Sequence, residues 1–115
     1  GGYLPAYAPR TDYGCGTREC GPVPERLPSE YIQDRLFFDS AVFTSEALRH
    51  LIAVSGPSQI VIGTDYPFSW TFSTRDPRLP RFTPVEHILE TPGLSDADRA
   101  AMLGGNEARL LKIPL

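Results

Sequence analysis

The sequence predicts an α/β fold, because a strand–helix–strand unit is followed by further helical segments. Residues 60–62 (IVI) are short, apolar and β-branched, as in a strand that is buried on both faces of a parallel sheet. A second short apolar run, residues 36–39 (LFFD), ends in an acid. The stretch from 36 to 63 therefore has the length of an ordinary βαβ unit.

The segment between the two strands has the pattern of an amphipathic helix. Thr44 is predicted to cap this helix, with Glu46 in its first turn. Gly56-Pro57 is predicted to end it. Apolar residues recur on one face at helical spacing, namely Ala47, Leu48, Leu51 and Ile52.

Three helices are predicted after the second strand, beyond a proline-containing loop over residues 64–82. Pro84 can start a short helix that runs through Leu89. Ser95 and Asp98 have the spacing of a capping box, which predicts a helix as far as residue 103, stopped by Gly104-Gly105. Asn106 is predicted to cap a last helix over residues 107–111.

Residues 1–35 are rich in Gly and Pro, and we expect a long loop there. Only residues 29–35 (SEYIQDR) favour a short helical turn. Cys15 and Cys20 are both in this part, and their spacing does not fit the paired ligands of a zinc site. We expect two free thiols, and with them a cytoplasmic protein, ahead of a disulfide or a metal site.

Bulk composition limits the size and the partners of this chain. Its 115 residues, 41% hydrophobic and 22% charged, suit one small globular domain. The net charge of −3 and the scattered basic residues predict no binding to nucleic acid or to a membrane surface. No signal peptide is recognisable. Two parallel strands cannot form an independent core, so the sequence looks like the closing part of a larger unit.

Gly63-Thr64-Asp65, directly after the second strand, is the most informative segment for chemistry. Ligands in α/β folds bind outside the carboxyl ends of the strands. Gly63 would allow a close approach of the backbone, and Asp65 would present a carboxylate that can bind a cation or move a proton. An aspartate that only stabilises a turn is the alternative, and the chemistry alone leaves both open.

The segment IGTDYPF, residues 62–68, resembles the strand-8 signature of the amidohydrolase-related family, which includes aminocarboxymuconate-semialdehyde decarboxylase and related aromatic-acid decarboxylases. Four further segments match in order: LFFDS (36–40), ALRHLI (47–52), LSDADRAA (94–101) and GNEARLLK (105–112). The resemblance implies a C-terminal portion of a (β/α)8 TIM-type barrel. Residues 1–35 would be a loop region, and residues 36–115 the last two βα units and the terminal helices.

The resemblance also implies a divalent metal, usually zinc, at the top of the barrel. Asp65 would be the metal ligand and a catalytic residue, whereas the histidine ligands of the family have no counterpart in this chain. Gly1-Gly2 resembles the remainder of a His-Gly-Gly-Gly run. Arg10 resembles an arginine that binds the substrate carboxylate in a neighbouring subunit, which implies a homodimer. The alternative for Arg10 is an ordinary exposed arginine.

Other candidates are weighed in the same way. Phe68 and Trp70 are expected to wall an aromatic substrate pocket, or else to pack on the barrel rim. Asp39 is expected to support the site rather than to react. His50 is expected to pack or to form hydrogen bonds, and His87 is not expected to be a ligand.

The predicted function is that of a metal-dependent carboxy-lyase or hydrolase acting on a small carboxylated, cyclic or unsaturated substrate. The metal would serve as a Lewis acid or hold a water. The alternative is a non-catalytic fragment that lacks the metal site and can only associate with a complementary chain. A third possibility is another α/β fold whose strand ends in Gly-Thr-Asp. The isolated chain is expected to be inactive, because one carboxylate cannot hold zinc tightly.

Overall fold

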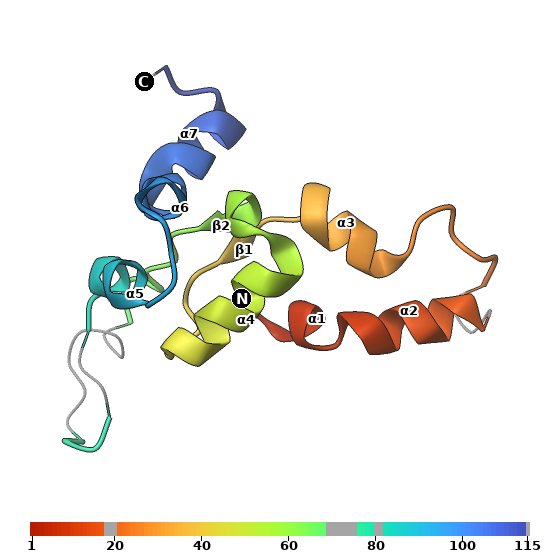
Figure 1. The fold of residues 1–115 in the computed structure, drawn as a ribbon, viewed down its shortest axis with the longest axis horizontal. Coiled ribbons are helices and arrows are strands. Elements are labelled where there is room, and N and C mark those ends of the chain that lie inside the picture. The colour runs from red at the N-terminus through yellow and green to blue at the C-terminus, as the bar shows by residue number, and fades with distance from the viewer. Residues whose placement is uncertain (18–20, 69–75, 80–81, 115) are drawn as a thin grey trace.

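The computed structural model describes residues 1–17, 21–68, 76–79 and 82–114. Strands β1 (Phe38–Asp39) and β2 (Ile60–Val61) are parallel, with Phe38 opposite Ile60 and Asp39 opposite Val61. Helix α4 (Ser45–Ser55) and the short 3-10 helix η1 (Pro57–Gln59) connect the strands. The predicted βαβ unit is therefore confirmed, in an α/β fold that is mostly helical (Figure 1).

The ends of α4 follow the prediction. The Thr44 hydroxyl oxygen accepts a hydrogen bond from the Ala47 N–H at 3.1 Å, which caps the helix. Gly56 ends it with a φ of 80°, a conformation that glycine adopts without steric cost. Leu48 and Leu51 are buried, so the predicted apolar face does point into the core.

The prediction of a loop over residues 1–35 is wrong. The structure has three helices there: α1 (Tyr3–Ala6), α2 (Ala8–Gly16) and α3 (Pro28–Asp34). Pro9 does not prevent α2, because it lies in the first turn, where a backbone N–H is not needed. Packing supports the helices, since α1 and α3 contact α4, and the Ser29 N–H of α3 donates to Asp12 Oδ1 of α2 at 2.9 Å. The helical turn predicted near residues 29–35 corresponds to α3.

The expectation of free thiols is also wrong for Cys15, which is disulfide-bonded. Cys20 lies outside the described residues. Sequence spacing cannot show this bond, because whether two thiols can be bridged depends on how the backbone places them. The cytoplasmic location that we inferred from free thiols therefore loses its basis and stays a prediction.

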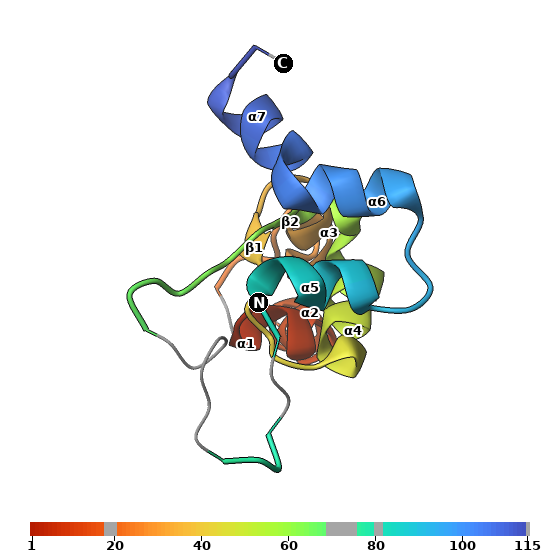
Figure 2. The ribbon, with the colours of Figure 1, turned by 90° about the vertical axis from the view of Figure 1, so that its left-hand side faces the viewer.

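The C-terminal part begins with α5 (Pro84–Glu90), which starts at the predicted proline, and continues through α6 (Asp96–Ala100), η2 (Ala101–Gly105) and α7 (Asn106–Leu111). The predicted capping box is confirmed, since Ser95 Oγ accepts from the Asp98 N–H at 3.1 Å and the Asp98 carboxylate accepts from the Ser95 N–H. Gly104 has non-helical backbone angles, so the helical path breaks at the predicted stop, and α7 leaves at an angle to α6 (Figure 2).

Asn106 is not the cap that we predicted, because it has helical backbone angles and makes no cap hydrogen bond. It is 2% exposed, and its side-chain amide donates to Pro57 O at 2.8 Å and to Ile60 O at 2.7 Å. The Ile62 N–H donates to the carboxylate of Glu107 at 2.6 Å. These two side chains of α7 therefore cover backbone groups on the edge of β2 that faces away from β1.

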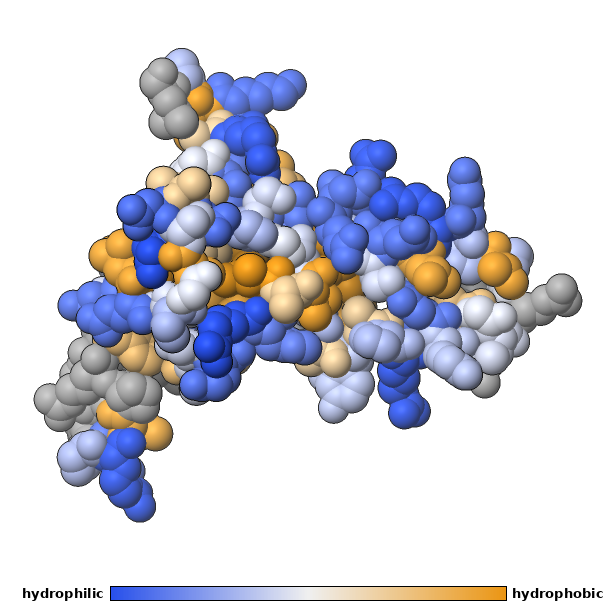
Figure 3. All heavy atoms as spheres, in the orientation of Figure 1, coloured by the Kyte–Doolittle hydropathy of each residue, from blue (hydrophilic) through white to orange (hydrophobic). Residues whose placement is uncertain are grey.

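The buried core joins all parts of the chain. Its hydrophobic members are Ala8, Ile32, Phe38, Leu48, Leu51, Ile60, Ile88 and Met102. Hydrophobic residues also form a band across the middle of one face of the molecule, over the strands and α4 (Figure 3). Within the described ranges, no helix has the length and apolar character needed to cross a bilayer.

Candidate active site at the strand ends

The carboxyl ends of β1 and β2 lie at the same edge of the sheet, because the strands are parallel. Asp39 is the last residue of β1, and Gly63 follows β2 closely. A Cβ atom on Gly63 would lie 2.8 Å from the Cβ of Asp39, which is closer than two carbons can approach. The expectation of a close approach at Gly63 is therefore confirmed, and the neighbour is the side chain that ends β1.

Ser40 joins the two strand ends. Its N–H donates to Val61 O at 2.9 Å, and its hydroxyl oxygen accepts from the Gly63 N–H at 3.2 Å. The side chain is 1% exposed, so these bonds are made away from solvent, where hydrogen bonds position groups firmly. The segment that leads to Asp65 thus leaves the sheet in a fixed direction.

Asp39 is exposed, and its Oδ1 accepts a hydrogen bond from the Ala41 N–H at 3.0 Å. The supporting role that we expected for Asp39 stays a prediction.

Asp65 is exposed and has a φ of 54°, in the left-handed region that non-glycine residues rarely adopt. Its carbonyl oxygen accepts from the Phe68 N–H at 2.9 Å, which closes a turn, and the Thr64 hydroxyl oxygen accepts from the Tyr66 N–H at 3.3 Å. The structure thus places Asp65 in a turn beyond the end of β2. Its assignment as a metal ligand stays a prediction.

The predicted substrate-binding residues are not brought together by the described structure. Phe68 is 57% exposed, and Trp70 lies outside the described residues. Arg10 is exposed on α2, which lies on the far side of α4 from the segment after β2 (Figure 1). It lines a separate surface cavity of about 530 Å³ with Tyr13. The roles of these residues stay predictions.

The two histidines lie in different environments. His50 is exposed, and the packing or hydrogen-bonding role that we expected for it stays a prediction. His87 is 6% exposed and stacks on Phe82 with 4.8 Å between the ring centroids. Burial lowers the pKa of His87 below its ordinary value. The sequence contains a signal for the burial of His87, because this residue shares one helical face with Pro84, Ile88 and Thr91, and all four are buried.

A zinc ion would need ligands that lie close together among these residues. Zinc sites in enzymes take about three protein ligands, usually including histidine. In the parts of the chain that the structure describes, no three His, Cys, Asp or Glu side chains are close enough to hold a metal ion. The described residues therefore do not form a metal site by themselves. Asp65 could supply a single ligand to such a site.

The sequence of this chain matches a known protein family. The family model described as Amidohydrolase matches residues 13–113. A 2-amino-3-carboxymuconate-6-semialdehyde decarboxylase from Dictyostelium discoideum is 31% identical over 113 residues. That match covers 96% of this chain and 29% of the relative, so the chain spans less than a third of the relative's length.

Solved structures with similar folds are decarboxylases as well. The 5-carboxyvanillate decarboxylase LigW from Sphingomonas paucimobilis is 28% identical, with a TM-score of 0.75, and the match covers 96% of this chain and 31% of that one. A 2,6-dihydroxybenzoate decarboxylase from Rhizobium is similar in fold, with a TM-score of 0.65, 22% identity and coverages of 96% and 32%. From the family match and the strand-end geometry, we conclude that the chain belongs to the amidohydrolase family.

Proposed function

We propose that this chain is the C-terminal portion of a metal-dependent decarboxylase with a (β/α)8 barrel. In this proposal β1 and β2 are the last two strands of the barrel, and the helices after β2 close it. The strand-end geometry carries the proposal. Asp65 follows β2 at the carboxyl edge of the sheet, and Gly63 packs there against Asp39 at the end of β1. Further support comes from the relatives, whose names describe decarboxylases.

The proposed substrate is a small carboxylated molecule with a cyclic or unsaturated skeleton. Asp65 would contribute one carboxylate to a divalent metal, zinc in this proposal, and the remaining ligands would come from outside these 115 residues. The bound metal would supply Lewis acidity. Phe68 and Trp70 would contact the skeleton of the substrate, and Arg10 would bind its carboxylate in the partner subunit of a homodimer.

The test is carbon dioxide release by the natural protein that carries these residues. Candidate substrates are carboxylated phenols and 2-amino-3-carboxymuconate semialdehyde, and the hydrolase alternative is assayed with lactones and amides. Asp65→Asn should abolish turnover, while Asp96→Asn, a fully exposed aspartate on α6, should leave it unchanged. Hydrolysis without carbon dioxide release, or full activity in Asp65→Asn, would contradict the proposal.

A second candidate function is supported by the apolar band in Figure 3 and by the two-stranded sheet. Parallel sheets are covered on both faces, so such a surface suits association with a complementary chain that completes the barrel. In this alternative the chain has no metal site and no activity of its own. Metal analysis of the purified chain separates the two candidates, since stoichiometric zinc in the isolated chain would exclude the non-catalytic one.

A further inference from the structure

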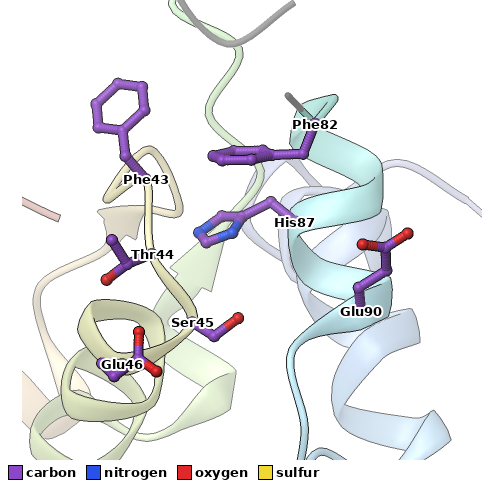
Figure 4. A pocket seen from close by; sticks show the side chains of 7 residues that line it. All are labelled: Phe43, Thr44, Ser45, Glu46, Phe82, His87 and Glu90. Atoms are coloured by element: carbon purple, nitrogen blue, oxygen red, sulfur yellow. The ribbon is translucent and has the colours of Figure 1, made fainter. Parts of the chain in front are cut away.

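A cavity of about 350 Å³ lies between the start of α4 and helix α5. Its walls come from the loop before α4, the first turn of α4, Phe82 and one face of α5 (Figure 4). A volume of this size suits a small organic molecule. The decarboxylase proposal uses none of the side chains that line it.

The base of the cavity holds a buried histidine with an unused nitrogen. His87 is 6% exposed, and its Nε2 has no hydrogen-bond partner within the described residues. Figure 4 shows the imidazole pointing from α5 toward Thr44 at the start of α4, beneath the ring of Phe82. Buried polar atoms are almost always paired, so a ligand atom that reaches Nε2 would complete this environment.

The other lining residues define the charge of that ligand. Glu46 and Glu90 contribute two carboxylates, and the lining contains no Lys or Arg. The N-terminus of α4 would favour an anion, but Glu46 already lies in that first turn and offsets it. Because burial lowers the pKa of His87, the imidazole is neutral at pH 7, and one of its nitrogens can accept a hydrogen bond from an N–H group of a ligand. The cavity is therefore suited to a positive charge.

Aromatic rings define the rest of the ligand. Phe43 and Phe82 both line the cavity, and aromatic faces attract ammonium and guanidinium groups as well as apolar carbon. We propose that this cavity binds a small organic cation. An N–H group of the cation would donate to His87 Nε2, the two glutamates would supply negative charge at the rim, and the carbon skeleton would pack on the phenylalanine rings. This inference is independent of the proposed decarboxylase function.

The test compares three ligands of nearly equal shape: benzylammonium, benzyl alcohol and benzoate. Each is titrated into the natural protein that carries these residues, while the Cε1–H signal of His87 is followed by NMR. Benzylammonium should saturate the signal with a Kd of about 1 mM, at least about tenfold tighter than either of the other two. Equal binding of benzyl alcohol, or tighter binding of benzoate, would overturn the proposal, as would a His87 signal that does not move.

Replacing exposed glutamates with glutamine tests the role of the two carboxylates in binding. Glu90→Gln should weaken benzylammonium binding by about threefold, and the double variant Glu46→Gln/Glu90→Gln by about tenfold, because both carboxylates are exposed to solvent. Glu25→Gln is the matched control, since Glu25 is exposed and does not line the cavity. Unchanged affinity in the double variant would refute the role of the carboxylates and with it the proposal.

Discussion

Replacing Asn106 with alanine tests how the last helix is attached to the sheet. The buried side-chain amide donates two hydrogen bonds, to Pro57 O and to Ile60 O. Asn106→Ala leaves both carbonyl groups without this donor, and each unsatisfied buried group costs about 1–3 kcal/mol. We expect a total loss of about 2–6 kcal/mol, which is large beside the roughly 5–15 kcal/mol by which a typical domain is stable.

The assay is urea unfolding followed by far-ultraviolet circular dichroism. The loss should lower the urea midpoint by about 1–3 M at an unchanged slope. Arg109→Ala is the matched control, because Arg109 also bonds a carbonyl of the same loop, Ser58 O at 2.6 Å, but is exposed. We expect that control to cost less than about 1 kcal/mol. Equal losses in the two variants would show that the buried amide does not attach α7 as described.

Three further predictions concern the strand ends, α4 and the buried histidine. Gly63→Ala should lower the free energy of unfolding by about 1–3 kcal/mol in urea titrations, because the added Cβ would overlap the side chain of Asp39. Gly16→Ala is the control, since it has open space around it and should change the free energy little. Thr44→Ala should cost about 1 kcal/mol in the same assay through loss of the helix cap. Burial lowers the pKa of His87 in the folded chain, so the unfolded chain binds a proton first as the pH falls. The free energy of unfolding should therefore be highest above about pH 6.5 and decrease below it, and an increase below that pH would contradict the burial of His87. His87→Phe should remove part of this decrease, whereas His50→Gln, at an exposed position, should not.

Local patterns in the sequence were enough to predict the βαβ unit and the starts of α4, α5 and α6. Thr44 and Ser95 are capping residues whose partners are three positions away, so the necessary information is contained in a few residues. Gly63 could be predicted as a site of close approach, but its neighbour, the side chain of Asp39, could be identified only once the strands were paired.

Features that depend on distant partners were missed. The helices of residues 1–35 are stabilised by packing on α4, which outweighs the local bias of their Gly and Pro residues. Asn106 was taken for a cap because its type favours caps, yet its partner Ile60 lies 46 residues away in the chain. His87 was considered only as a metal ligand, and its burial, which its helical face indicates, was not predicted.

We propose that Asp65 is a metal ligand at the carboxyl edge of the sheet, and anomalous X-ray diffraction at the metal edge, from crystals of the natural protein that carries these residues, tests this proposal. We expect a peak about 2.0–2.2 Å from a carboxylate oxygen of Asp65, the distance typical of zinc. A fully occupied metal whose ligands do not include Asp65 would contradict it.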